Sequence, residues 1–464
     1  MAKLAEILRA AGMAAGEAGR PEALRTAPCR DLEADWAVAR PHLQACAELL
    51  RRLPPRPRRS PLEQEAAAAL LGEGRSAREA FLRRHAPAVY DRLTAGRTRL
   101  VRMVELAWAA AAAFPALVPD AAEVASEQRG RLEEQDGVQV DQGIFFAHLL
   151  ADRASGLHLL QAMGQPTPAA LERLPALRAQ GRVELPQATL ERVGVRGHIT
   201  FNNQAWLNAE DDETEEALET LVDLVLLDDA IQVGVMRGGV MTKAKYAGRR
   251  VFGAGINLTR LYHGQISLVR FMLQREAGPL AKVYRGLARP EPDRAGDDER
   301  TEKPFIGAVE AFAIGGHCQL LLVLDHVIAE RGAYFNLPAR KEGIVPGLAN
   351  LRLPRFIGER ATRQGLFFNR SFPADGPEGR QLCDQVVDGG PQLEAAIDLA
   401  ASELVGAGVT SLTANRRALR VGAEPLDLFR RYLATYAREQ AACLYSPALI
   451  DNLVRHWNAR QRRI

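Results

Sequence analysis

Two glycine-containing turns are the segments of this sequence whose residue types and spacing suggest chemistry. The first is Arg250-Val-Phe-Gly-Ala-Gly255-Ile256-Asn257-Leu258, and the second is Val309-Glu-Ala-Phe-Ala-Ile-Gly315-Gly316-His-Cys-Gln319. Glycine lets the backbone approach a ligand closely, and the N–H groups at the start of a helix attract negative charge. If the two turns converge, the backbone N–H groups of Ile256 and Gly316 can bind one developing oxyanion. Taken alone, each turn is more often a packing or turn feature.

The motifs of several common reaction classes are absent. The sequence has no Gly-x-x-x-x-Gly-Lys-[Ser/Thr] loop, no Gly-x-Ser-x-Gly elbow and no His-Glu-x-x-His motif. Leu258 stands where a dinucleotide fingerprint needs its third glycine. The five cysteines are scattered and include no Cys-x-x-Cys pair. We therefore expect no metal, flavin or nicotinamide cofactor.

The elements that must position these turns change in character along the chain. The first ~165 residues have apolar positions at helical spacing, and a Pro/Arg segment at 53–61 reads as an exposed connection. After a break at 164–186, short β-type runs (193–201, 231–236, 305–309 and 326–328) alternate with helical stretches at 215–227 and 264–273. The chain becomes helical again after about Leu393. We expect a helical domain at 1–185, an α/β core at 186–395 and a helical segment at 396–464.

The composition indicates few partners other than small molecules. The 464 residues carry 60 Lys and Arg against 57 Asp and Glu, a net charge of +3, which gives no reason to expect nucleic acid or an acidic membrane. The longest apolar run, 106–114, is far below the ~20 residues of a membrane span. Charges interrupt the first residues where a signal sequence needs an apolar core, so we expect a cytoplasmic protein. The basic segment 455–463 is interpreted as a solvated helix face.

The order and surroundings of the two turns resemble the crotonase (enoyl-CoA hydratase/isomerase) superfamily. The resemblance covers about residues 190–400 and includes Ala205-x-Leu207-Asn208-Ala209 and the stretch from Leu324 to Pro346-Gly347. It implies an α/β fold with a spiral core of ββα units, beside the helical N-terminal domain and helical C-terminal segment. It also implies trimers, often paired into hexamers, and an acyl-CoA substrate whose thioester oxygen accepts from the N–H groups of Ile256 and Gly316. Ala209 and Gly255 fall on substrate-binding positions.

Two positions depart from the hydratase pattern of the superfamily. The two acid/base glutamates of hydratases fall here on Gln319 and Ala339. Neither an amide nor a methyl group can transfer protons, so hydration by paired carboxylates is disfavoured.

Within the superfamily, the sequence resembles the 3,5-dihydroxyphenylacetyl-CoA dioxygenases of vancomycin-type glycopeptide biosynthesis, which supply dihydroxyphenylglycine. This resemblance implies conversion of the thioester and O₂ into 3,5-dihydroxyphenylglyoxylate and free CoA, through a stabilised carbanion and without metal or organic cofactor. Glu210, Arg275 and Gln319 fall on the positions that hold the phenol hydroxyls. We expect Ile256, Leu258 and Ile344 to line a dry pocket for O₂, although ordinary core packing explains them equally well.

Several alternatives stay open at this point. Glu210 begins the acidic run 210–213, which by itself indicates a solvated helix start, and Arg275 by itself indicates an exposed salt bridge. The base is unassigned between Glu210 and the phenolate of the substrate. The rival functions are a thioesterase, isomerase or decarboxylase of the same superfamily, or a non-catalytic acyl-CoA-binding protein.

Overall fold

A seven-stranded mixed sheet lies at the centre of the α/β part of the chain. The computed structural model describes residues 2–12, 31–242, 244–289 and 300–464. The strand order is β1-β2-β3-β4-β7-β9-β12. The hairpin β1–β2–β3 is antiparallel and every later pairing is parallel. The strands are β1 Arg182–Leu185, β2 Ala188–Val193, β3 Arg196–Phe201, β4 Val233–Gly238, β7 Phe305–Val309, β9 His326–Glu330 and β12 Gln385–Val387.

Parallel strands buried on both faces are made of continuous apolar runs, and β7 is one of them. All five residues of β7 are buried. Its partner β4 carries Gly234 opposite Phe305, where a Cβ atom on the glycine would come within 2.3 Å of the phenyl ring. A side chain at residue 234 would therefore push the two strands apart.

A smaller three-stranded sheet carries the second glycine turn. Its order is β11-β10-β8, with β8 Phe312–Ile314 parallel to β10 Tyr334–Asn336 and β11 Phe372–Pro373 antiparallel to β10. Strand β8 leads through Gly315 into helix α14 Gly316–Leu321. A separate two-stranded sheet pairs β5 Leu287–Ala288 with β6 Arg300–Thr301.

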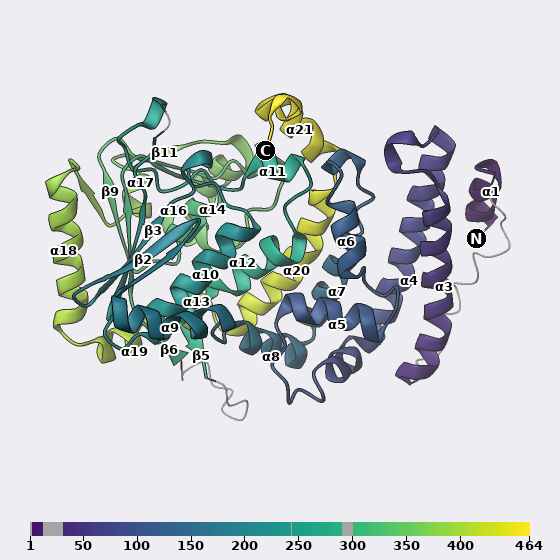
Figure 1. Cartoon of the computed structure of the whole chain (residues 1–464), viewed down its shortest axis with the longest axis horizontal. Coiled ribbons are helices and arrows are strands. Elements are labelled where there is room, and N and C mark those ends of the chain that lie inside the picture. Colours follow the sequence, from purple (N-terminus) through teal and green to yellow (C-terminus); the bar gives the residue numbers. More distant parts are fainter. Residues whose placement is uncertain (1, 13–30, 243, 290–299) are drawn as a thin grey trace.

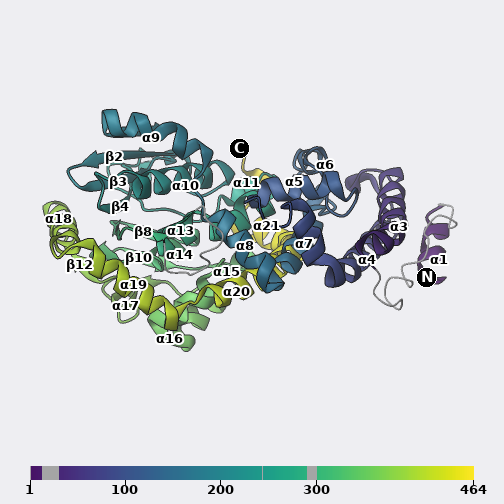
Figure 2. The same ribbon diagram turned by 90° about the horizontal axis from the view of Figure 1, so that it is seen from below.

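Helices cover the sheets and extend the molecule at one end. In Figures 1 and 2, α1, α3 and α4 lie at one end of the long axis and α18 at the other, with α20 between them. The helices before the sheet are α1 Ala2–Ala10, α3 Leu32–Arg52, α4 Pro61–Leu93, α5 Met103–Ala113, α6 Ala121–Glu127, α7 Gln139–Ala151, α8 Arg153–Met163 and α9 Pro168–Gln180. The later ones are α10 Asp212–Leu227, α11 Leu258–Tyr262, α12 Gln274–Ala277, α13 Pro279–Arg285, α15 Ala339–Glu342, α16 Ala349–Phe368, α17 Gly379–Leu382, α18 Pro391–Gly406, α19 Val409–Ala423, α20 Leu426–Leu444 and α21 Pro447–Trp457.

The N-terminal and C-terminal helices form one packed body. Helix α7 packs directly on α20, and Gly143 in α7 makes room for it, because a Cβ there would lie 2.4 Å from the Cβ of Ala441. The boundary expected at 185 falls between the paired strands β1 and β2, and the one expected at 395 falls inside α18.

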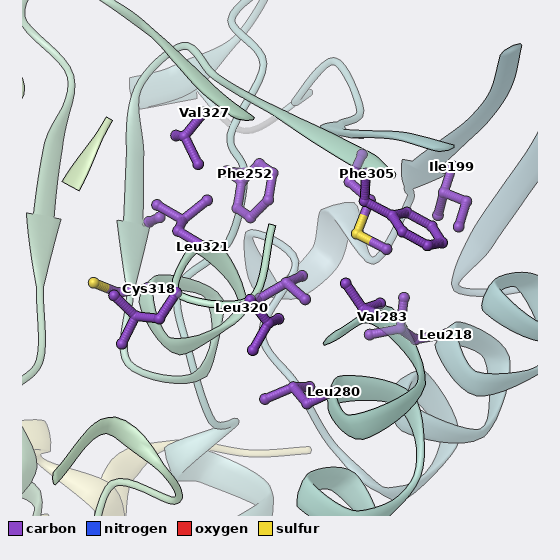
Figure 3. Close-up of a cluster of buried hydrophobic side chains, with 14 of the residues drawn as sticks. Ile199, Leu218, Phe252, Leu280, Val283, Phe305, Cys318, Leu320, Leu321 and Val327 are labelled. Atoms are coloured by element: carbon purple, nitrogen blue, oxygen red, sulfur yellow. The ribbon is translucent and has the colours of Figure 1, made fainter. Parts of the chain in front are cut away.

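The largest apolar cluster fills the space between the main sheet and the helices around it. Figure 3 shows Ile199 and Phe305 from the sheet facing Leu218, Leu280 and Val283 from α10 and α13. Leu320 and Leu321 of α14 belong to the same cluster. The helix that starts at the second glycine turn is therefore anchored in the core.

Buried ion pairs attach the C-terminal helices to the α/β part. The Glu424 carboxylate, at the end of α19, contacts Arg352 at 2.8 Å, Arg285 at 3.1 Å and Arg355 at 3.4 Å. Glu302 contacts Arg420 at 2.7 Å in a second cluster. Burial would raise the pKa of Glu424, but the guanidinium of Arg352, with Arg285 and Arg355, lowers it to about 2.

The structure corrects several expected elements. The run at 193–201 joins the end of β2 to β3, and β4 begins two residues later than expected, at Val233. Residues 168–180, inside the expected break, form helix α9, with Pro168 at its first turn. In the expected helix at 264–273 only Leu268–Leu273 is helical, and those residues form a π-helix. Strand β7 has the expected limits.

Among the described helices, none alone has the length and apolar character for a membrane span, although the bent pair α18–α19 passes on these two criteria together. The described cysteines, Cys46, Cys318, Cys383 and Cys443, are free thiols, and Cys29 lies outside the described residues.

Candidate functional site

The two glycine turns lie against each other. An isolated β-bridge pairs Gly253 with Ala313, and the Ile314 N–H donates to the Gly253 carbonyl at 3.0 Å. Gly255 and Gly315 have φ values of +76° and +55°, and a Cβ at Gly255 would lie 3.1 Å from the Gly315 Cα. Only glycine combines such backbone angles with such a close approach.

The two N–H groups expected to bind an oxyanion are unused. In the described part of the chain, neither the Ile256 N–H nor the Gly316 N–H donates a hydrogen bond to the protein. Their neighbours are paired: the Glu210 N–H donates to the Gly255 carbonyl and the Asn257 N–H to the Glu210 carbonyl, both at 2.8 Å. Since buried backbone donors are nearly always satisfied, two free N–H groups beside converging turns are suited to an anionic oxygen of a ligand.

Arg275 is buried beside these turns, with 3% of its surface exposed. Its guanidinium donates to Glu210 at 2.8 Å, to Glu276 at 2.8 Å and to the Gln319 side-chain oxygen at 3.1 Å. It also donates to the Gly316 carbonyl at 2.7 Å, and its Nε lies 3.6 Å from Glu215. The structure thus brings together three residues expected at the site, Glu210, Arg275 and Gln319.

The charges in this cluster do not balance. Burial would lower the pKa of Arg275, but the carboxylates of Glu210, Glu215 and Glu276 raise it above its ordinary value. Burial raises the pKa of Glu215 well above its usual range, because a buried carboxyl group disfavours its charged form. A permanent cation with an excess of carboxylates can orient a polar ring and tolerate a change of charge on it.

A π-helical turn places Arg275 in the site. The N–H groups of Phe271 and Met272 both reach the carbonyl of Ser267 at 3.2 Å, and helix α12 follows directly. A π-turn holds more residues than an α-turn, so it rotates the residues that follow. Arg270, just before, remains exposed and pairs with Glu216, whereas Arg275 points inward.

The acidic run 210–213 is a helix start, as its composition indicated, but most of it is buried. Asp211 is the N-cap of α10 and accepts from the Thr214 N–H. Asp212 accepts from the Ser267 N–H at 3.1 Å, at the start of the π-turn. Glu210 and Asp211 are 3% and 2% exposed, so the interpretation of this run as solvated is wrong for both.

A small cavity of about 30 Å³ lies between Arg275 and the glycine turns. This space holds about two water-sized molecules, and most of its wall is apolar. Ile256 and Ile344, two of the residues expected at an O₂ pocket, line it together with Ala339. Leu258, the third, lines the neighbouring groove instead.

The groove beside this cavity has about 530 Å³ of free volume. Ala209, predicted to contact the substrate, lines it, and the first glycine turn forms part of its wall. Basic and aromatic side chains surround the groove: Trp206, Lys245, Tyr246, Lys341, His456, Trp457 and Arg462. The segment 455–463 is therefore not simply a solvated helix face, because three of its residues line this groove.

His317 and Cys318, which follow the second turn, lie in the core. The His317 ring packs between Phe201 and Phe252, and burial lowers the pKa of His317, which keeps the ring neutral. Burial raises the pKa of Cys318 to about 12, so its thiol is not a nucleophile at neutral pH.

Sequence reasoning missed several lining residues. Glu276 binds Arg275 directly. Its position next to Arg275 in the sequence could have indicated this contact. Glu342 lines both the cavity and the groove, and Tyr436 reaches the cavity from α20. No local pattern marks Tyr436, which is far from the turns in sequence.

Comparison with known proteins shows the family of this chain. The profile described as enoyl-CoA hydratase/isomerase matches residues 298–435, and the chain belongs to this family, the crotonase superfamily. The more specific similarity is to (3,5-dihydroxyphenyl)acetyl-CoA 1,2-dioxygenase of Amycolatopsis orientalis. That protein is 47% identical over 410 residues, covering 88% of this chain and 93% of its own length.

More distant relatives match a smaller part of the chain. The short-chain-enoyl-CoA hydratase of Clostridium acetobutylicum is 26% identical over 242 residues, 52% of this chain and 83% of that protein. Among solved structures, OdaA of Pseudomonas aeruginosa is 19% identical and covers 60% of this chain and all of its own, with a TM-score of 0.48.

Proposed function

We infer that this chain is a dioxygenase of an aryl-acetyl-CoA thioester, and we propose 3,5-dihydroxyphenylacetyl-CoA as its substrate. The observation that carries this inference is the 47% identity to the dioxygenase over nearly the whole chain. The buried cluster of Arg275, Glu210 and Gln319 beside the two unused N–H groups supports it. The products are 3,5-dihydroxyphenylglyoxylate and free CoA.

The groove suits the CoA part of the substrate. Lys341 and Arg462 supply positive charge for its phosphates, and Trp206 and Trp457 supply flat surfaces for its adenine. The thioester then enters the cavity, where its oxygen accepts from the N–H groups of Ile256 and Gly316. Removal of one such donor typically costs about 10²–10³ in rate.

The aryl ring then lies against the charged cluster. The phenol hydroxyls donate to Glu210, and Arg275 and Gln319 orient the ring and its charge. The small cavity admits a ring only if its lining side chains move, since about 30 Å³ is far below the size of a phenyl group. We therefore propose that binding of the thioester opens this cavity.

The proposed reaction begins with loss of a proton from the carbon between ring and thioester. The resulting carbanion, shared with the thioester oxygen, passes one electron to O₂, and the radical pair recombines to a peroxide on that carbon. The distal peroxide oxygen attacks the thioester carbonyl and expels CoA. Loss of the second proton as the O–O bond breaks leaves the α-keto acid, with both atoms of O₂ in the product.

The carbanion is itself the electron donor, so the proposed reaction needs no metal or organic cofactor. O₂ is apolar and favours a dry space, which Ile256 and Ile344 provide in the cavity. Ala339 lines this space with a methyl group, so residue 339 itself brings no carboxyl group and no bound water to it.

We also propose that the chain works in the cytoplasm as a trimer or a dimer of trimers, in antibiotic biosynthesis. Phe368 is 67% exposed on α16, and Leu419 and Val421 are each 73% exposed on α19, so both helices offer apolar side chains for contacts between subunits. Sedimentation equilibrium tests the assembly, and a monomeric mass would contradict it.

The experiment that tests the function measures O₂ uptake and CoA release together. Metal-stripped protein is given 3,5-dihydroxyphenylacetyl-CoA, with and without a chelator. We expect one CoA released per O₂ consumed, with no effect of the chelator. CoA release without O₂ uptake would indicate a thioesterase instead, and a bound thioester with neither signal would indicate a binding protein.

A further inference from the structure

Glu342 occupies the boundary between the cavity and the groove. It is the last residue of the short helix α15, three positions after Ala339. Among the residues that the structure describes, three line both spaces, namely Ile256, Pro338 and Glu342. Of these, Glu342 alone carries a titratable group.

This boundary is where the reacting carbon must lie. In the proposed function, on which this inference rests, the CoA arm fills the groove and the ring lies against Arg275. The Cα atom joins the ring to the thioester, so it passes from one space into the other. A group that lines both spaces is within reach of its hydrogens.

The backbone holds Glu342 in this position. Its N–H donates to the Pro338 carbonyl at 2.9 Å, and Gly343 ends the helix with a φ of +84°. Gly343 packs on α21, where a Cβ would lie 2.8 Å from the Leu449 Cα. The carboxyl group is therefore carried by a short, well-anchored turn.

The Glu342 carboxyl group is unengaged. Within the residues that the structure describes, its oxygens make no hydrogen bond and no ion pair. Glu210, by contrast, is bound to Arg275 at 2.8 Å, and Glu276 is bound to Arg275 and the Leu348 N–H. The oxygens of Glu210 and Glu276 are thus occupied by hydrogen-bond donors of the protein, whereas those of Glu342 are open to a proton of the substrate.

Burial also favours proton uptake by Glu342. It raises the pKa of Glu342 to about 8, with Lys341 lowering and Glu210 raising it by their charges. A base works best with a pKa near the working pH.

We propose that Glu342 is the general base that removes the Cα proton of the thioester. The Cα–H bond breaks, its electron pair passes to the thioester oxygen held by the Ile256 and Gly316 N–H groups, and the proton goes to a carboxylate oxygen of Glu342. The carboxyl group becomes neutral as the enolate forms, so charge is conserved. In this chain the proton acceptor thus stands one helical turn beyond the methyl group of Ala339.

Deuterium exchange tests this step without O₂. The probe is phenylacetyl-CoA, which has no phenol group, incubated anaerobically in D₂O with the full chain, and uptake of deuterium at Cα is followed by mass spectrometry. We expect Glu342→Gln to slow this exchange about 10²- to 10⁴-fold, the usual contribution of a general base. Glu342→Asp should restore part of the rate, and the affinity for phenylacetyl-CoA should stay within about twofold in both variants.

The matched control is Glu359→Gln, the same chemical change at an exposed residue paired with Arg363. Its exchange rate should equal that of the unmodified chain. Unchanged exchange in Glu342→Gln would overturn the proposal. Exchange that requires the ring hydroxyls, and is absent with phenylacetyl-CoA, would overturn it in favour of the substrate phenolate.

Dependence on pH separates Glu342 from other bases. The charged and titratable groups that line the two spaces with it are Glu210, Arg275, Glu276 and Tyr436 in the cavity, and Lys245, Tyr246, Tyr334, Lys341, His456 and Arg462 in the groove. Exchange should rise with pH, reach half of its maximum near pH 8 and level off about one pH unit higher, and Glu342→Gln should remove this rise. An unchanged profile in the variant would contradict the proposal.

Failure of Glu342 as the base can be distinguished from failure of the proposed dioxygenase function. If the unmodified chain exchanges the Cα proton through Glu342 but consumes no O₂ with the dihydroxyphenyl thioester, the base is supported and the dioxygenase is not. If it consumes O₂ normally and Glu342→Gln does the same, the function stands and the base is another group.

Discussion

At the scale of residues, the site depends on one guanidinium holding more negative charge than it can neutralise. Arg275 faces three carboxylates, Glu210, Glu215 and Glu276, and its fourth side-chain partner, Gln319, is neutral. An amide can accept the same hydrogen bond as a carboxylate without adding charge. The glutamine therefore keeps a fourth negative charge out of the cluster.

We predict that Gln319→Glu impairs oxygenation by about 10- to 100-fold, the effect of 1–3 kcal/mol from an uncompensated buried polar group. The new carboxylate lies beside Glu210 and Glu276 and draws Arg275 away from the ring. The measurement is the kcat/KM of O₂ uptake, with Gln319→Met to separate loss of the hydrogen bond from gain of charge. Unchanged kcat/KM in Gln319→Glu would remove this residue from the site.

Gly316 is essential for a different reason, the lack of space for a side chain. A Cβ there would lie 1.6 Å from the Glu210 Oε2 and 2.8 Å from an Arg275 nitrogen. We predict that Gly316→Ala separates this ion pair and lowers kcat/KM at least about 100-fold, as loss of an oxyanion donor does. Gly422→Ala, where nothing lies within 4 Å, is the control and should keep full activity. A fully active Gly316→Ala would contradict the assigned position of the oxyanion.

Family resemblance was enough to select Arg275, Glu210 and Gln319 from the sequence. Their local surroundings pointed the other way, because an arginine beside Glu276 and an acidic run are usually exposed. Burial of these charges depends on contacts between residues 44 to 65 positions apart, which no local pattern encodes. Glu342 was missed because an unpaired glutamate in a short helix has no sequence signature.

At the scale of elements, two glycines in helices show how context decides the effect of one methyl group. Gly143 in α7 faces α20, with the Ala441 Cβ only 2.4 Å from where its own Cβ would be. Gly72 in α4 is exposed, with nothing within 4 Å. Both positions are helical, so backbone propensity alone favours alanine at each.

We predict opposite changes in the free energy of unfolding for these two substitutions. Gly143→Ala should lower it by about 1–3 kcal/mol, because α7 and α20 must move apart. Gly72→Ala should raise it by about 0.5–1 kcal/mol, the ordinary gain in helix propensity. Urea denaturation measures both changes. A stabilising Gly143→Ala would show that α7 and α20 do not pack as closely at this position as the structure has them.

Helices and strands with a long apolar pattern could be predicted from the sequence, whereas very short ones could not. Strand β7 has the limits its apolar run indicated, and α10 begins three residues before its expected start. The strands β8, β10 and β11 have two or three residues, too few to establish an alternation. The π-turn at 268–273 has the apolar pattern of any buried helix, so its extra residue is invisible in sequence.

At the scale of the whole molecule, the C-terminal helices connect the helical end to the α/β part. Helix α20 packs on α7, and Glu424, just before it, binds Arg285 and Arg352 from the α/β part. The composition of the sequence divided the helical ends and the α/β part into separate domains. Composition indicates which helices and strands form, but not which of them pack against each other. The contacts join residues more than 70 positions apart.

Glu424 makes this connection sensitive to acid. The pKa of its carboxyl group is about 2 in the folded chain against 4.5 as an ordinary value, so its contribution is present above pH 4.5 and is lost as the pH falls toward 2. We predict that the unmodified chain loses about 3 kcal/mol more stability across this range than Glu424→Gln. Urea denaturation at stepwise lower pH measures the difference. Parallel curves for the two proteins would contradict it.

The π-turn before Arg275 has a consequence for how such an active site can be acquired or lost. One residue inserted in a helix turns everything after it by ~100°. At 268–273 that insertion lies next to a residue whose inward direction places it in the site. Deletion of a single codon there would restore an ordinary helix and turn Arg275 away from the cavity. The sequence would still contain every residue of the site. A change of reaction in this lineage can thus come from a shift in register alone, with no substitution at the site.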